Sequence, residues 1–437
     1  MIFEAGPAGP VRHLGEPNSR IHEGVFMSFR LILLMMVLAL ALPVMADEAR
    51  LMPVGDGDFA VSGNLSQVRD DVRPAAGVQG EPASVFMPAR GESVSTALSA
   101  PENDSRSYSL TVTARELSAG VSLPLSASGA VLRIVPEAGG GARLLQVDDV
   151  MIRQGAWDLQ GRAAARDLAR GEELSQAAPV FGADTLAMRL SDRVGAGEAV
   201  LQVREAALLR GGRYQLHVFE PESPVRARLS AERPIAALGQ EFAAGGQLMG
   251  AAGLAVERVQ GDLISPDGRR IPVDWEAADG EDFGTRLALP RTGANSRGLW
   301  ELEARLEGAG PQGPVRRDVR VAFEMVAPTA RLNGAAAVAP SAEGWTVRVA
   351  VDVASPGRYE VRATLPDVGT AHAASWLEPG RQELVLQFPG SLPRQAVLED
   401  LRLVDQSRVA LLHVQQEGLA IGNQRDRDIL PEARAGL

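Results

Sequence analysis

The residues of this 437-residue chain whose types and spacing could do chemistry are its carboxylates. The stretch "ADGEDFG" places Asp279, Glu281 and Asp282 around Gly280, and oxygen ligands on a glycine turn can hold Ca²⁺. Because the terminal bidentate glutamate of an EF-hand loop is missing, a solvated acidic turn is favoured over a metal site. The same interpretation applies to two other acidic pairs, Asp148 with Asp149 and Asp56 with Asp58.

The five histidines do not form a metal-binding pattern. His13 and His22 precede the export signal described below, and none of the other three, His217, His372 and His413, has a histidine partner at ligand spacing. The metallopeptidase motif H-E-x-x-H does not occur. We therefore interpret His217 and His413 as ordinary surface or edge histidines.

Motifs for other common chemistries are also missing from the sequence. There is no cysteine, which excludes disulfides, thiolate metal sites and a cysteine nucleophile. No G-x-S-x-G elbow, Walker loop or dinucleotide fingerprint occurs, and the glycine run 139–141 leads into an expected strand rather than a helix. We assign no catalytic, cofactor-binding or metal residue, although a glycosidase carboxylate pair, which meets only in space, stays open.

The N-terminal region carries an export pattern. "MSFRLILLMMVLALALPVMADEA" combines Arg30, an apolar run over 31–42, Pro43 and a small residue before an acidic stretch. This order is typical of a secretory signal from Met27 to Ala46, with cleavage after Ala46. The apolar run is shorter than the roughly 20 residues of a membrane span, although an uncleaved anchor is the alternative. We expect a periplasmic or extracellular protein with no membrane span in the mature chain.

The remainder of the chain alternates apolar and polar residues, the period of half-buried strands. "VRVAFEM" and "GWTVRVAVDV" are the clearest cases, and "SPDG" at 265–268 predicts a hairpin turn. One stretch, 158–176, is expected to hold at most a short exposed helix. The fold class that follows is all-β, with tandem immunoglobulin-like β-sandwich domains after an N-terminal signal peptide. Proline- and glycine-rich breaks divide the chain into an over-extended or disordered start (1–26), the signal peptide (27–46), a loop-rich segment (47–100), an N-terminal β-sandwich (101–222), an immunoglobulin-like domain (223–327), a C-terminal β-sandwich (328–421) and a polar tail (422–437).

One phrase is repeated three times: a glycine, a short spacer, an aromatic residue and then an alternating strand. It occurs around Tyr214, Trp300 and Tyr359. In immunoglobulin-like sandwiches a tyrosine near the start of a late strand packs at a corner and bonds to nearby backbone. The spacing between Tyr214 and Trp300 fits one sandwich domain, whereas Tyr359 comes too soon and is expected on an earlier strand.

Four stretches carry a resemblance to a known family: "SASGAVLRIVP", "GDLISPDGRRIPVDW", "GLWELEARLEG" and "LEDLRLVDQSRVALL". With the order of domains, they resemble an uncharacterised secreted family of gammaproteobacteria, a domain-of-unknown-function group. The resemblance covers roughly residues 85–420. It implies an N-terminal β-domain, an immunoglobulin-like middle domain, a C-terminal β-domain and export, and it brings no activity or site residues.

Three functions are compatible with these patterns. The first is an exported, non-catalytic protein that binds a protein or an envelope glycan through loops or sheet edges. The second is a secreted hydrolase, or an accessory module of one, with a carboxylate site between domains. The third is a calcium-stiffened adhesin. The net charge of −11 argues against nucleic acid as a partner, and no cofactor is expected.

Overall fold

The computed structural model describes most of the chain after residue 46. The described ranges are 47–55, 57–68, 73, 82–89, 97–137, 142–170, 185–209, 211–278, 280–291, 298–391 and 393–422. The expected signal peptide from Met27 to Ala46, the start (1–26) and all of the polar tail except residue 422 lie outside them. The described residues from Asp47 onward form one compact unit. Within the described ranges, no helix has the length and apolar character needed to cross a bilayer.

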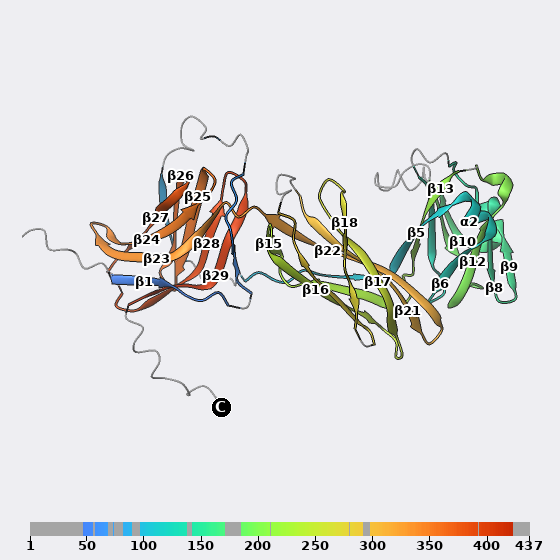
Figure 1. Cartoon of the computed structure of the whole chain (residues 1–437). Coiled ribbons are helices and arrows are strands. Elements are labelled where there is room, and N and C mark those ends of the chain that lie inside the picture. The colour runs from blue at the N-terminus through green and yellow to red at the C-terminus, as the bar shows by residue number, and fades with distance from the viewer. Residues whose placement is uncertain are drawn as a thin grey trace, which may run out of the picture. The chain divides into compact units, whose positions relative to one another are not determined.

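The all-β prediction is confirmed (Figure 1). The helical content of the described residues is one short α-helix, α2 (Ala114–Ala119), and three 3₁₀ turns. Thr113 starts α2 with a capping box, because its hydroxyl accepts from the backbone of Glu116 and the Glu116 carboxylate accepts from Thr113. The expected helix over 158–176 is not observed in its described part, 158–170. That part forms two strands around a 3₁₀ turn (Gly161–Ala164), in agreement with its poor helical spacing of apolar residues.

The N-terminal sandwich consists of two sheets around one apolar core. Tyr108, Tyr214 and Leu117 are among its fully buried side chains. One sheet has the order β10-β11-β7-β13-β5, with β10 at Ala165–Arg170, β11 at Leu186–Leu190, β7 at Val131–Pro136, β13 at Arg213–Phe219 and β5 at Ser107–Thr113. The other has the order β6-β12-β8-β9, with β6 at Val121–Leu125, β12 at Gly197–Val203, β8 at Val150–Gln154 and β9 at Trp157–Gln160.

The middle sandwich also has two sheets, and its core contains Trp300 and the stacked rings of Phe242 and Phe323. One sheet has the order β19-β20-β16-β14-β4, with β19 at Glu276–Ala277, β20 at Asp282–Ala288, β16 at Glu241–Met249, β14 at Arg226–Ala231 and β4 at Glu102–Ser105. The other has the order β15-β22-β21-β17-β18, with β15 at Ile235–Ala237, β22 at Gly313–Val326, β21 at Trp300–Gly310, β17 at Ala255–Ile264 and β18 at Arg270–Val273. The expected hairpin at 265–268 is present between β17 and β18, and Gly268 supplies the positive φ of its turn.

The C-terminal sandwich is a single ten-stranded sheet that folds over, so that β27 at one end contacts β26 and β3 at the other. Trp345 and Phe388 stack in its core. The C-terminal part of the chain supplies β23 (Ala330–Ser341), β24 (Gly344–Val353), β25 (Gly357–Leu365), β26 (Gly369–Leu377), β27 (Gly380–Pro389), β28 (Ala396–Asp405) and β29 (Ala410–Ile421). The strands β24 and β25 both bury their apolar faces, as their alternation predicts, but they pair with other strands rather than with each other.

The segment 47–100 completes this C-terminal sandwich from the other end of the chain. Its strands are β1 (Asp47–Leu51), β2 (Phe59–Ala60) and β3 (Ala83–Pro88). The strand β1 lies between β23 and β29, β2 pairs with β29, and β3 pairs with β26 (Figure 1). Phe59 is 2% exposed in the core. The extended pieces expected in this segment therefore belong to a sheet formed about 300 residues later in the sequence.

All three aromatic residues of the repeated phrase are buried. The hydroxyl of Tyr359 donates to the carbonyl of Ser355, four residues upstream, over 2.7 Å. The hydroxyl of Tyr214 instead accepts from the backbone N–H of Arg143. The bond to nearby backbone that is expected of a corner tyrosine is therefore made by Tyr359 and not by Tyr214.

We predict that Phe59→Ala destabilises the C-terminal sandwich by about 3–5 kcal/mol, because it leaves a cavity where β2 closes the core. Relative to the wild type, hydrogen exchange measured by mass spectrometry should become faster in β28 and β29 and stay unchanged in the N-terminal sandwich. Val54→Ala, at a side chain that is 52% exposed, is the control. Equal exchange for the two variants would contradict the account of residues 47–60 as part of this core.

Candidate functional site

The acidic turns found in the sequence have structural roles or lie at the surface. Asp279 and Asp56 are outside the described residues, and Asp282 begins β20 at the surface. The carboxylate of Asp149 accepts from Arg204, and that of Asp58 accepts from the backbone of Gln416. Among the residues that the structure describes, no three His, Cys, Asp or Glu side chains are grouped to hold a metal ion.

The histidines occupy three different environments. The prediction that His413 lies at the surface is wrong, because it is 4% exposed within β29 and bonds Gln415. Burial also lowers its pKa. His372 bonds Glu360 across the neighbouring strands β25 and β26. His217 is half-buried on the outer face of β13, and burial, together with the positive charge of Arg133, lowers its pKa.

The junction between the N-terminal and middle sandwiches contains a buried ion pair that the sequence analysis did not single out. Arg317 of β22 and Glu220, directly after β13, are both fully buried, with 2.7 Å between Nη1 and Oε2. The Glu220 carboxylate also accepts from the backbone N–H groups of Ser126 and Ala127. Burial lowers the pKa of Arg317, and the negative charge of Glu220 opposes this shift.

The Arg317 guanidinium is satisfied on all sides. It donates to the carbonyl of Val225, to the carbonyl of Arg316 and to the hydroxyls of Ser126 and Ser223. Buried charges are tolerated when they are paired and fully hydrogen-bonded, and the removal of one partner is then strongly destabilising. The pair therefore joins a loop of the N-terminal sandwich to a strand of the middle one.

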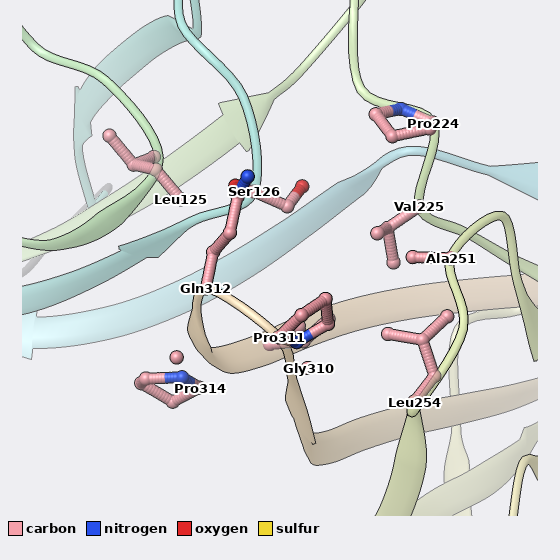
Figure 2. A pocket seen from close by; sticks show the side chains of 12 residues that line it. Leu125, Ser126, Pro224, Val225, Ala251, Leu254, Gly310, Pro311, Gln312 and Pro314 are labelled. Atoms are coloured by element: carbon pink, nitrogen blue, oxygen red, sulfur yellow. The ribbon is translucent and has the colours of Figure 1, made fainter.

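Figure 2 shows a small pocket that is lined in part by Ser126 and Val225, two residues that bond Arg317. Leu125 and Ser126 line it from the N-terminal sandwich, and the β21–β22 turn with Pro311 and Gln312 lines it from the middle one. Its volume is about 70 Å³, which leaves room for a few water molecules and no larger ligand. We therefore do not place a ligand here.

A much larger polar cleft, of about 920 Å³, lies at the same junction. We call it the junction cleft. Its lining residues come from β5 and β13 of the N-terminal sandwich and from β4, β18, β21 and β22 of the middle one. Its lining is Asn103, Asp104, Ser105, Ser107, Ser109, Leu110, Thr111, Gln215, His217, Arg270, Glu303, Arg305, Asp318, Val319 and Arg320. Among the described residues, the lining contains three carboxylates, three arginines and no Phe, Tyr or Trp.

One wall of the junction cleft is a layer of arginines over buried carboxylates. Arg320 donates two hydrogen bonds to one oxygen of Glu303, and Arg270 and Arg305 pair with the other oxygen. Asp262 accepts from both Arg270 and Arg305. The side chains of Glu303 and Asp262 are 5% and 12% exposed, whereas those of the three arginines are 41–50% exposed. The groups presented to a ligand are therefore guanidinium groups.

Gly261 explains how β17 brings Asp262 beside Glu303. A Cβ atom at residue 261 would come within 1.8 Å of the Glu303 carbonyl oxygen. Only glycine permits this close approach of the two strand backbones. Alternation of apolar and polar residues does not reveal such a close contact between two strand backbones.

Asp318 is the carboxyl group of the junction cleft with an altered ionisation. Its Oδ2 accepts from the backbone N–H of Ser109 in β5 over 2.7 Å, so it bridges the two sandwiches. Burial, assisted by the negative charge of Glu303, raises its pKa to about 6, although the Ser109 hydrogen bond and two nearby arginines oppose the shift. Asp318 lies diagonally across strands from Glu303, a relation that separates side chains by about 7–8 Å.

Comparison with known proteins identifies the N- and C-terminal parts. Residues 74–220 match the family model described as "Domain of unknown function (DUF4785) N-terminal domain", and residues 329–422 match the corresponding C-terminal domain. Among curated proteins, no sequence matches the chain. The predicted resemblance to an uncharacterised family is confirmed.

Two solved structures are similar to the chain. A crystal structure of a DUF4785 family protein from Legionella pneumophila aligns over 82% of this chain and 98% of that one, with a TM-score of 0.62 and 18% identity. At this identity the likeness shows the fold. A crystal structure of a "Putative membrane anchored protein" from Corynebacterium diphtheriae aligns over 80% and 93% of the two chains at 12% identity, and its TM-score of 0.15 carries no argument.

We predict that the contribution of Asp318 to the stability of the protein falls as the pH rises through about 6. Its pKa is raised by folding from an ordinary value of 3.8, so the native state holds the proton more tightly than the unfolded chain. The favourable contribution is complete below pH 3.8 and is lost between pH 3.8 and about 6. Asp318→Asn keeps an acceptor for Ser109 and cannot ionise.

Melting temperatures measured from pH 4 to 7 test this prediction. The variant and the wild type should melt together at pH 4, and the variant should melt at the higher temperature at pH 7. A difference that does not change with pH would contradict the assignment of the titration to Asp318.

Proposed function

The chain belongs to the DUF4785 family, and we propose that it is an exported, non-catalytic protein that binds a protein or an envelope glycan in the junction cleft. The observation that supports the proposal best is the cleft itself. Its volume of about 920 Å³ lies at the upper end of the range of small-ligand sites. Its polar side chains come from two sandwiches that a buried ion pair joins.

The state of the carboxylates favours binding over catalysis. Both oxygens of Glu303 are paired with arginines, so neither is free to act as a nucleophile or a general base. Asp262 pairs with Arg270 and Arg305 through Oδ2 and is not among the residues that line the cleft. The carboxylate of Asp104 is also paired, with Arg226 and Arg228. These groups hold the arginines in place and leave their outer edges for a ligand.

Export is the second part of the proposal. It rests on the charged, apolar and small-residue order from Met27 to Ala46. The compact unit that follows begins at Asp47, directly after the expected cleavage site. A protein without cysteine gains stability from buried cores alone, and the three apolar cores of this unit supply it.

A second candidate function, a secreted hydrolase, is favoured by Asp318 alone. A carboxyl group with a pKa of about 6 can act as a general acid near neutral pH, and Glu303 lies within the carboxyl spacing of a glycosidase pair. A glycosidase also needs a second carboxylate as nucleophile or general base, and the ion pairs of Glu303 argue against that role. We therefore consider binding better supported than hydrolysis.

We predict that Gln215→Trp weakens ligand binding at least about tenfold, because an indole at this exposed position of β13 fills the junction cleft. The assay is direct binding of the chain from Asp47 to Leu437 to arrays of envelope glycans and peptides. Gln387→Trp, at an exposed position of β27 in the C-terminal sandwich, is the matched control and should bind like the wild type.

Two results would count against the proposal. Equal binding by both tryptophan variants would place the site elsewhere. Release of cleaved products from the same arrays by the wild type, and not by Asp318→Asn, would replace the binding function with the hydrolase.

A further inference from the structure

The edge of β5 borders the junction cleft and offers unpaired backbone groups. The strand is the last of its sheet and pairs with β13 only. In an antiparallel pair, alternate residues direct their N–H and C=O groups away from the partner. The backbone N–H of Ser109 bonds Asp318 rather than β13, which shows that residues 107, 109, 111 and 113 are the outward-directed set.

Most of these outward-directed N–H groups already have a partner. That of Ser107 donates to the hydroxyl of Ser105, that of Ser109 to Asp318, and that of Thr113 to Glu116. Among the described residues, no partner exists for the N–H and C=O of Thr111 or for the C=O of Ser109. Thr111 is exposed, and both Ser109 and Thr111 line the cleft, so these three groups belong to residues at its border.

The contact between Ser109 and Asp318 shows what this edge accepts. A carboxylate oxygen from the middle sandwich occupies the place where a carbonyl of an added strand would bond. The next outward-directed residue, Thr111, is two positions along, about 7 Å away. A strand that continues this ladder would exchange two hydrogen bonds with Thr111.

The opposite wall of the cleft adds a charge preference. Arg270 and Arg305 pair with Asp262 and Glu303, and the side chains of the two arginines are 41% and 44% exposed. Each guanidinium carries five N–H donors, and the contacts with Asp262 and Glu303 do not use all of them. An acidic side chain of a ligand would therefore bind here, whereas a lysine or arginine would be repelled.

We propose that the junction cleft binds an extended acidic peptide segment, which adds as a strand to β5 at Thr111 and places a carboxylate on Arg270 and Arg305. The inference rests on the proposed function and names its ligand. Addition of a strand to a sheet edge is a common mode of peptide recognition. A saccharide fits less well, because among the described residues no Phe, Tyr or Trp lines the cleft to stack on a sugar ring.

The test uses Thr111→Pro, which removes one outward N–H and leaves the pairing with β13 intact, as proline at a sheet edge permits. Thr111→Val, which keeps the N–H and removes the hydroxyl, is the matched control. Both variants of the chain from Asp47 to Leu437 are titrated with peptides selected from a pentapeptide library on the wild type. Circular dichroism and melting temperature check their folding.

We expect the selected peptides to be rich in Asp and Glu. Thr111→Pro should weaken their binding at least about tenfold, and Thr111→Val should change it less than about twofold. Peptide binding should also slow hydrogen exchange at the Thr111 amide. If Thr111→Pro does not fold, N-methylation of the peptide tests the same hydrogen bonds from the side of the ligand. Methylation of the alternate amides that point toward β5 should abolish binding, and methylation of the other alternate set should not.

The other outcomes separate the inference from the proposed function. If the wild type selects glycans and no peptides, and Gln215→Trp blocks them, the cleft is a binding site and strand addition is overturned. Peptides that bind Thr111→Pro and the wild type equally also overturn it. If neither class binds in the cleft, the proposed function fails as well.

Discussion

The buried pair of Glu220 and Arg317 is the interaction on which the arrangement of the first two sandwiches depends. Arg317 lies in the inward register of β22, between Val315 and Val319, where the alternation calls for an apolar side chain. An ion pair this deeply buried contributes little net stability compared with apolar packing, but a single unpaired charge would be costly. The two sandwiches must therefore stay together for either charge to be satisfied. The junction cleft exists because they do.

One wall of the junction cleft also pairs buried carboxylates with arginines. Carboxylates are buried and arginines lie over them, so a chain with a net charge of −11 presents a guanidinium surface at one place. Asp318 links this surface to β5 and is the group whose ionisation changes between weakly acidic and neutral pH. Asp318 thus belongs both to the lining of the cleft and to the contact between the sandwiches, and its protonation changes the charge at both.

Much of the fold could be predicted from the sequence, because alternation with a period of two follows directly from strand geometry. Local sequence determines the all-β class, the hairpin around Gly268 and the placement of Trp300 and Tyr359 on the buried faces of their strands. The insertion of β1 between β23 and β29 is not, because nothing in a five-residue strand identifies a partner about 300 residues away. The burial of His413 has the same origin, since β2 and the polypeptide around it cover that face of β29.

The candidate site was harder to predict than the fold. Glu303 and Asp318 are polar residues on the outward face of alternating strands, and a single sequence does not show which outward faces a second domain covers. Arg317 did carry a signal, because a charged residue in an apolar register must find a buried partner. That partner, Glu220, directly precedes "PESP", a stretch whose prolines indicate a linker. Its role becomes visible only in the structure, where the residue that follows β13 meets Arg317 of β22.

The most direct test of the central claim is a distance measurement between the first two sandwiches by pulsed electron paramagnetic resonance. The chain has no cysteine, so Arg115→Cys in α2 and Arg286→Cys in β20 give two unique sites for spin labels. The account predicts one narrow distance distribution, and a broad one when Arg317→Met is added. A broad distribution in the presence of an intact Glu220–Arg317 pair, or a narrow one that Arg317→Met leaves unchanged, would contradict it.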